Sequence, residues 1–174
     1  MSAAGFSLRP ARPEDVPTLL RLIRALADYE RLLHEVRASE SDLETALFGS
    51  TPHASALIAE SAGEAIGFAL WFYTFSTFTG RAGLYLEDVY VLPRHRGQGV
   101  GRAIFRYLAT QALAEGCARL EWAVLDWNAP ALGFYAKLGA QPMGEWTVQR
   151  LSGPALAALA AEDGGKSWPR HPST

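Results

Sequence analysis

Residues 94–105, RHRGQGVGRAIF, follow the apolar run LYLEDVYVL (84–92) and lead into a helical pattern of apolar residues. Glycine stands at three alternate positions, Gly97, Gly99 and Gly101, where the backbone can take unusual dihedrals and be approached closely. A strand, a glycine-rich turn and a helix start predict an anion site, because the first N–H groups of the helix point outward and carry partial positive charge. Arg96 and Arg102 add charge that pairs with phosphate. We interpret the stretch as a cradle for a pyrophosphate.

Two other phosphate-binding loops fit this stretch poorly. A Walker loop requires Gly-Lys-Ser/Thr, which is absent. A dinucleotide fingerprint, Gly-x-Gly-x-x-Gly, would place its third glycine at Arg102 or at Ile104, depending on where it starts. Glu121 lies about twenty residues further on, as that fingerprint requires, but inside a predicted strand rather than at its end. A tight turn without a ligand is the remaining structural alternative.

The rest of the chain predicts a mixed α/β fold. Ser39, Asp42 and Gly49 are the expected N-cap, capping-box partner and stop of a short helix, and Gly63-Glu64 joins two β-rich runs into a hairpin. Residues 5–152 are expected to form a single domain, and the polar tail 163–174 to be disordered. The expected strands are 6–11, 54–61, 65–75, 84–92, 118–125 and a last one at 147–151; the expected helices begin at residue 13, at 39, after the glycine stretch and at 128.

Composition argues against several classes of function. The net charge of -2 gives no electrostatic reason to expect nucleic-acid or membrane binding. The N-terminus lacks the apolar stretch of a signal peptide, and no apolar run reaches membrane-spanning length, so we expect a cytoplasmic protein. Cys117 is the single cysteine and the four histidines show no ligand spacing, so we expect neither a disulfide nor a metal site.

Arg96-x-x-Gly99-x-Gly101 resembles the acyl-CoA signature of the GNAT N-acetyltransferase superfamily. Three stretches, in the same order, resemble the diamine (spermidine/spermine) acetyltransferases and their thialysine acetyltransferase relatives: RLIRALADYE (21–30), YLEDVYVLPRHRGQGVG (85–101) and AVLDWNAPALGFYAKLGA (123–140). The resemblance runs from about Leu8 to Leu151. It implies the GNAT fold, with a central mixed and splayed sheet flanked by helices. It also implies an acetyl-CoA-dependent N-acetyltransferase that acts directly on a primary amine of a small molecule, and a homodimer.

The implied reaction, attack of an amine on an acetyl thioester, needs a neutral amine, donors for the developing oxyanion and a proton for the departing thiolate. A lysine-like amine has a pKa of about 10.4 and is mostly charged at pH 7. Glu87 is the candidate that holds the ammonium and removes its proton, directly or through water, and Tyr135 is the candidate general acid. The structural alternatives are a carboxylate satisfied within its strand and a tyrosine that only packs. Asp88 points the other way in a regular strand, so we interpret it as structural.

The resemblance also implies where acetyl-CoA lies. Its amide arm would pair with the exposed backbone of a strand that carries a bulge, here Val89, Tyr90 and Val91, and an N–H group there would face the oxyanion. Asn128 would cap the short helix, bind the pantetheine arm or do both, and Ala131 would lie beside it. The pyrophosphate would lie on the cradle, which consists of Arg96, Gly97, Gln98, Gly99, Val100, Gly101 and Arg102.

The acceptor side is expected to be acidic. Thr77 departs from the polyamine-acetylating relatives, which tend to carry an acidic residue there, whereas thialysine-acetylating relatives carry a small hydroxyl. We therefore expect thialysine, a lysine-like amino acid or a short diamine rather than a long polyamine. The alternatives are a protein N-terminus or an antibiotic amine as acceptor, and a non-catalytic acyl-CoA-binding regulator. The residues expected to contact the acceptor are Tyr29, Glu30, Thr77, Glu87, Glu121 and Trp122.

Overall fold

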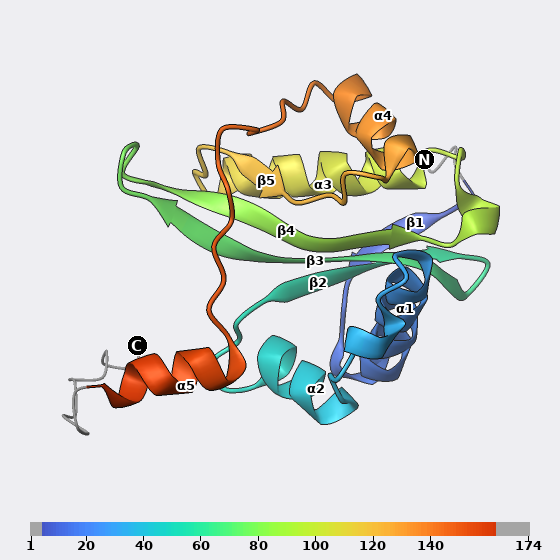
Figure 1. Ribbon diagram of the computed structural model, residues 1–174. Coiled ribbons are helices and arrows are strands. Elements are labelled where there is room, and N and C mark those ends of the chain that lie inside the picture. The colour runs from blue at the N-terminus through green and yellow to red at the C-terminus, as the bar shows by residue number, and fades with distance from the viewer. Residues whose placement is uncertain (1–4, 163–174) are drawn as a thin grey trace. The chain divides into compact units, whose positions relative to one another are not determined.

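Residues 5–162 are described by the computed structural model, and they fall into two compact units that divide between Leu125 and Asp126. The first unit holds strands β1–β5 and helices α1–α3, and the second unit holds helices α4 and α5 (Figure 1). The predicted disorder of 163–174 concerns a segment outside the described residues.

One five-stranded sheet runs through the first unit in the order β1-β2-β3-β4-β5. The first four strands pair antiparallel and β5 pairs parallel to β4, so the sheet is mixed, as the sequence predicts. Helices α1 and α2 lie on one face of this sheet and α3 lies on the other (Figure 1). The bounds are β1 (Ser7–Pro10), α1 (Val16–Tyr29), α2 (Glu40–Phe48), β2 (Ser55–Ser61), β3 (Glu64–Ser76), β4 (Arg81–Val91), α3 (Val100–Ala114) and β5 (Leu120–Trp122).

The short-range expectations for the first unit are confirmed. The Asp42 N–H donates to Ser39 Oγ at 3.2 Å, and the Ser39 N–H donates to Asp42 Oδ2 at 2.8 Å, which is the predicted capping box of α2. Strands β2 and β3 form the predicted hairpin, closed at Ala62 and Gly63, which both have positive φ. These features depend on residues within a few positions of one another, so local sequence rules find them.

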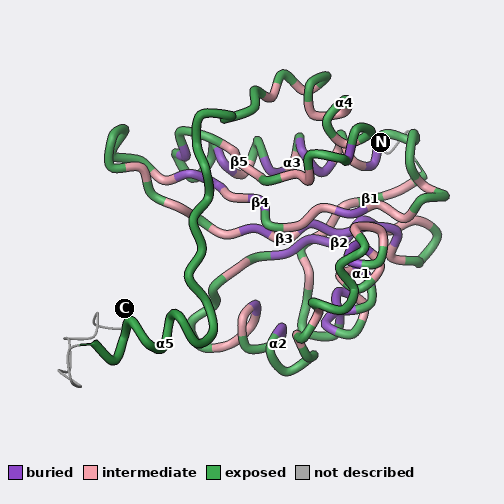
Figure 2. The backbone as a smooth tube through the Cα atoms, in the orientation of Figure 1, coloured by how far each residue is buried: buried purple, intermediate pink, exposed green. Residues whose placement is uncertain are grey.

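Apolar side chains fill both faces of the sheet. Leu19 of α1, Phe68 of β3 and Tyr90 of β4 belong to one buried cluster between the sheet and the α1/α2 layer. On the other face, the Trp71 ring lies 6.2 Å from the Tyr107 ring of α3. Figure 2 shows that the buried stretches concentrate in the central strands and in the helix sides that face them. Phe68 and Trp71 therefore lie on opposite faces of β3, the first against the α1/α2 layer and the second against α3, as the period of two in a strand requires.

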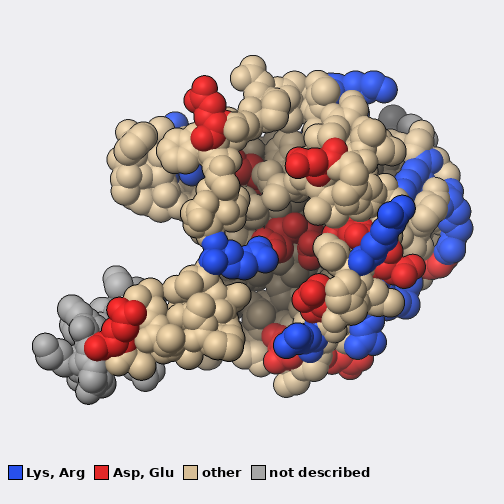
Figure 3. Space-filling model, viewed as in Figure 1, with Lys and Arg blue, Asp and Glu red and all other residues tan. Residues whose placement is uncertain are grey.

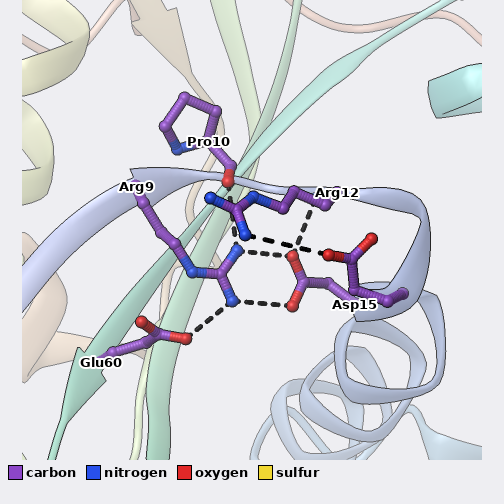
Figure 4. Close-up of polar contacts among 6 residues, drawn as sticks. Arg9, Pro10, Arg12, Asp15 and Glu60 are labelled. Atoms are coloured by element: carbon purple, nitrogen blue, oxygen red, sulfur yellow. Dashed lines mark hydrogen bonds and ion pairs between the residues drawn. The ribbon is translucent and has the colours of Figure 1, made fainter. Parts of the chain in front are cut away.

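A partly buried ion-pair group joins the start of α1 to the sheet (Figure 4). Arg9 of β1 donates to both carboxylate oxygens of Asp15, at 2.6 and 2.8 Å, and to Glu60 of β2 at 2.6 Å. The Arg12 N–H also donates to Asp15, at 2.7 Å. Hydrogen bonding from Arg9 holds the pKa of Asp15 below its usual value. This bidentate group fixes the connection from β1 into α1, and hence the position of α1 on the sheet.

The second unit differs from the prediction in one element. Helix α4 (Ala129–Lys137) follows Asn128, whose Oδ1 accepts from the Ala131 N–H at 3.3 Å, so the predicted cap is confirmed. The predicted strand at 147–151 is wrong: this segment pairs with no described strand, and a strand without a partner is not stable. Helix α5 (Gly153–Ala161) follows instead, because alanine and leucine favour helix and Pro154 suits its first turn.

Candidate functional site

Strand β4 changes character at Glu87. Leu70 of β3 pairs with Asp88 and Trp71 pairs with Leu86, so Glu87 is an extra residue that forms a β-bulge. Strand β5 pairs with β4 only over Leu84–Leu86. Beyond Glu87 the outer edge of β4 therefore has no ladder partner within the described sheet. The bulge that the resemblance implied is present, and it lies at the residue expected to act on the amine.

The backbone beyond the bulge alternates between two edges. The Leu92 N–H donates to the Ile66 carbonyl of β3 at 2.9 Å, and alternate residues of a strand point their backbone groups to the same edge. The backbone groups of Tyr90 therefore also face β3, whereas those of Val89 and Val91 face the outer edge. Of the three positions expected to pair with the cofactor arm, this geometry favours Val89 and Val91.

Three carboxylates, those of Glu30, Glu87 and Asp88, gather at the bulge on the side of α1, and we call them the acidic group. Burial, followed by the negative charges of Glu87 and Glu30, raises the pKa of Asp88 to about 6, so both glutamates lie near it. Burial also raises the pKa of Glu30, which caps the C-terminal end of α1. Figure 3 shows acidic side chains gathered near the middle of the face viewed. Such a group attracts a cation, and a carboxylate with a pKa near 6 is a better proton acceptor at neutral pH than an ordinary one.

The cradle has the geometry that the glycines predict. Gly97 and Gly99 have φ values of 75° and 85°, and Gly99 is the N-cap of α3. A Cβ atom at either glycine would meet no protein atom within 4 Å, so the surface is open to a ligand. Arg102 is exposed in the first turn of α3, beside the outward N–H groups of that turn. These residues fit a pyrophosphate, because donors and positive charge meet at an unfilled backbone surface.

Arg96 lies between the cradle and the acidic group. Its guanidinium carbon lies 4.6 Å from the Tyr29 ring centroid and 5.4 Å from that of Tyr90. Its Nε donates to the Val91 carbonyl at 2.9 Å, on the outer edge of β4. Arg96 therefore connects the end of α1, which carries Tyr29 and Glu30, with the loop that leads into α3. The sequence predicted this arginine as a phosphate partner and did not foresee its contact with the acceptor side.

The other predicted acceptor residues occupy three different places. Glu121 pairs across the β4–β5 ladder with Tyr85, and its Oε2 accepts from Arg119 Nε at 2.6 Å. The Trp122 ring lies 4.9 Å from Phe105 of α3, on the opposite face of the sheet. Thr77 is exposed in the turn between β3 and β4, roughly 20 Å along β4 from Glu87 at about 3.3 Å per residue. Among the described residues, Glu30 and Glu87 both lie near Asp88, and Thr77 stands apart from them.

Tyr135 and Asn128 belong to the second unit. Tyr135 is half-buried on α4, and its ring lies 5.5 Å from that of Phe134. Asn128 caps the same helix through Ala131, so one of its two predicted roles is present. The predicted role of Tyr135 as an acid and that of Asn128 toward the cofactor stay predictions.

Asp88 is a candidate site residue that the sequence analysis interpreted as structural. In a regular strand it would point away from Glu87, but the bulge brings both carboxylates to the same side. The available signal was the adjacent pair Glu87-Asp88, because two neighbouring charged residues in an otherwise apolar strand call for a structural or functional explanation. Tyr85 was missed: burial, and then the charges of Glu87 and Glu121, raise its pKa.

In 5–162, no three or more His, Cys, Asp or Glu side chains are arranged to hold a metal ion. None of the helices in that range has the length and apolar character needed to cross a membrane.

The comparisons with known proteins agree with this geometry. The profile of the Acetyltransferase (GNAT) family matches residues 20–140, which include the acidic group and the cradle. The chain is 41% identical to the thialysine N-epsilon-acetyltransferase of Mus musculus over 168 residues, 90% of this chain and 98% of that protein. It is 42% identical to the thialysine N-epsilon-acetyltransferase of Bos taurus over 166 residues, 89% of this chain and 97% of that protein.

A solved structure extends the likeness to the fold. The integron cassette protein VCH_CASS6 from the mobile metagenome of V. cholerae superimposes with a TM-score of 0.76 at 26% identity, over 91% of this chain and 99% of that one. The family resemblance and the fold class inferred from the sequence are therefore both confirmed.

Proposed function

Because this chain belongs to the GNAT acetyltransferase family and is an N-acetyltransferase, we propose that it transfers the acetyl group of acetyl-CoA directly to a primary amine of a small molecule. The observation that carries the proposal is the grouping of Glu30, Glu87 and Asp88 at the point where the outer edge of β4 loses its partner strand. The carboxylates attract an ammonium ion, and an extended amide chain can pair with the open edge beside them.

The residues that would hold acetyl-CoA lie on β4 and the cradle. The outward backbone groups of Val89 and Val91 suit the amide arm, and the first turn of α3 with Arg102 suits the pyrophosphate. When bound, acetyl-CoA supplies the acetyl thioester that the amine attacks. Asn128 and Ala131 are proposed to contact the same arm. The acetyltransferase domain is proposed to comprise residues 5–152.

Glu87 and Asp88 are proposed to prepare the amine. Glu87, directly or through water, accepts a proton from the acceptor ammonium, which frees the nitrogen lone pair to form the C–N bond of the amide as the C–S bond breaks. Asp88 shares this role, since its pKa of about 6 suits neutral pH better than the value of about 4.3 of an ordinary Glu. Tyr135 donates its phenolic proton to the departing thiolate and is reprotonated, through water, by the second proton that the amine nitrogen loses as the amide forms. The net products are the N-acetylated amine, the free thiol and one proton.

The acceptor is proposed to be short. Relatives that are 41% and 42% identical to this chain are thialysine acetyltransferases, and Thr77 provides no negative charge for the far end of a long polyamine. Thialysine, a lysine-like amino acid or a short diamine fits these features best. On the family resemblance, we further propose a homodimer that acts in the cytoplasm.

The proposed role of Glu87 toward the amine is tested by measuring thiol release from acetyl-CoA with thialysine as the acceptor. Glu87→Gln keeps the size of the side chain and removes its charge, and we expect its turnover to fall roughly a hundredfold or more. Glu44→Gln, on the exposed side of α2, is the matched control and should keep wild-type turnover. A wild type that releases no thiol with any amine would overturn the proposed function.

Two further variants test the remaining assignments. Tyr135→Phe deletes one hydroxyl, and loss of a general acid should cost roughly a hundredfold in turnover. A loss of less than about threefold would mean that Tyr135 only packs. Gly99→Val adds a branched side chain at a positive φ on the cradle, so calorimetry should find a much weaker acetyl-CoA complex. An unchanged affinity would remove the cradle from the binding site.

A further inference from the structure

A charged pair stands next to two aromatic rings on the face of the sheet that carries the acidic group. Arg119 Nε lies 2.6 Å from Glu121 Oε2, and their side chains are 41% and 37% exposed. Glu121 pairs with Tyr85, whose ring lies 5.2 Å from that of Phe72. Directly paired residues share a face, and Phe72 lies on the face opposite to Trp71 and α3. We call Phe72, Tyr85, Arg119 and Glu121 the distal patch.

A missing side chain makes room for Arg119. A Cβ atom at Gly83 would stand 3.2 Å from both Cγ and Nε of Arg119, and 2.8 Å from Thr74 Oγ1. The stem of Arg119 therefore lies directly over Gly83, against the sheet, while Glu121 accepts its Nε–H. Among the described residues, nothing accepts a hydrogen bond from its two terminal nitrogens. The guanidinium is thus oriented by the protein and keeps donors for a ligand.

The distal patch and the acidic group are neighbours along β4. The charges of Glu87 and Glu121 both raise the pKa of Tyr85, after burial, so both carboxylates lie near its hydroxyl. Glu87 is two positions beyond Tyr85, and neighbouring strands lie about 5 Å apart, so the Cα atoms of Glu87 and Glu121 are separated by roughly 8 Å. The side chain of a lysine-like amino acid spans roughly 6 Å from its amine to its Cα, with bonds of about 1.5 Å.

We propose that the distal patch binds the charged head group of an α-amino acid acceptor. Glu121 accepts hydrogen bonds from the α-ammonium, the free nitrogens of Arg119 donate to the α-carboxylate, and the side-chain amine extends to Glu87. This inference rests on the proposed function and narrows its acceptor to a zwitterionic amino acid of about lysine length. A diamine lacks the carboxylate and would bring a second cation toward Arg119, so the patch favours amino acids over diamines.

The test compares thialysine with the diamine that results when its carboxylate is removed. Arg119→Gln should lower kcat/KM for thialysine roughly tenfold or more, chiefly through KM, because a charge-assisted contact to the carboxylate is lost. The same variant should raise kcat/KM for the diamine, because a repelling cation is removed. Arg119→Lys keeps the charge and should recover part of the preference for thialysine. Arg106→Gln, exposed on α3 at the other face, is the matched control and should change neither value.

The outcomes separate this inference from the function on which it rests. Equal losses on both amines, or an unchanged KM for thialysine, would overturn the head-group assignment while leaving the acetyltransferase function intact. A wild type that acetylates neither amine would instead overturn the proposed function. In that case, calorimetric titration of thialysine into wild type and Arg119→Gln still decides the inference: weaker binding to the variant supports it, and equal binding or none overturns it. Thermal unfolding of each variant identifies a loss that comes from misfolding.

Discussion

The two halves of β4 differ more than their similar apolar sequences suggest. Before the bulge, Leu84 and Leu86 are 0% and 1% exposed, and Leu86 pairs with Trp71 on the face covered by α3. After it, Asp88 and Tyr90 face α1, and the outer edge has no partner strand. The extra residue reverses which face of the sheet the alternate side chains of β4 occupy, and the ladder between β4 and β5 ends there. A strand can thus contribute to the core in one half and to a polar site in the other.

The largest effect is expected from removing the bulge. Deletion of Glu87 makes β4 regular, so one half must turn its side chains to the wrong face. Exposure of Leu84 and Leu86 alone would lower the free energy of unfolding by roughly 3 kcal/mol or more. Urea unfolding measures this loss, and Glu87→Ala, which keeps the extra residue, is the control. Equal stability of the deletion and the control would show that the exchange of faces is unimportant.

The next effect concerns Asp88 in the second half. Its pKa of about 6 in the folded protein exceeds the value of about 3.9 in an unfolded chain, so the folded state binds the proton more tightly. Its contribution to stability is therefore present at low pH and is lost as pH rises from about 4 to about 6, by roughly 3 kcal/mol in total. Asp88→Asn should remove this loss and be the more stable protein at pH 8.

Urea unfolding of wild type and Asp88→Asn at pH 5 and pH 8 measures this difference. The advantage of the variant should be larger at pH 8, and an equal advantage at both values would contradict the assignment. The same variant should acetylate more slowly, because the carboxyl proposed to share the proton transfer is gone.

A smaller effect is expected just beyond the second half of β4, where Arg96 stacks on Tyr29 and Tyr90. Arg96→Lys keeps the charge but loses the planar group, and an exposed cation–π contact is worth about 0.5–1 kcal/mol. The KM values for acetyl-CoA and for the amine should therefore both rise two- to fivefold, roughly as that energy predicts. A rise in only one KM would show that Arg96 does not connect the two sides. Arg106→Lys is the control, because it lies on α3 away from both.

The smallest effect is expected at Thr77, in the turn that precedes the first half of β4. An exposed ion pair contributes about 0–1 kcal/mol, so Thr77→Asp should raise the ratio of spermine to thialysine efficiency by at most about fivefold. Steady-state kinetics on both amines at matched ionic strength measures this ratio, with Thr79→Asp in the same turn as the control. A ratio that does not move, or a wild type that prefers spermine, would remove Thr77 from the acceptor site.

Local rules predicted the parts of the fold that depend on near neighbours in sequence. The capping box at Ser39 and the hairpin at Gly63 need only residues a few positions apart, and both form. Strand β5 was predicted over 118–125 but ends at Trp122, because pairing with β4 stops at the bulge. The prediction of a strand at 147–151 was wrong for a similar reason, since strand formation depends on a partner strand that can lie anywhere in the chain.

The features of the candidate site likewise divide into those that the sequence predicts and those that only the tertiary structure reveals. The sequence alone determined the cradle, because glycines before an apolar helix dictate positive φ and an open N-terminus, and it determined the family through three ordered motifs. Tertiary structure alone decided that Asp88 joins Glu87, that Arg96 stacks on Tyr29, and that Arg119 lies over Gly83. Each of these depends on the register between strands or on contact between distant segments. A shift of one residue in that register reverses which face a side chain occupies, and no short stretch of sequence specifies it.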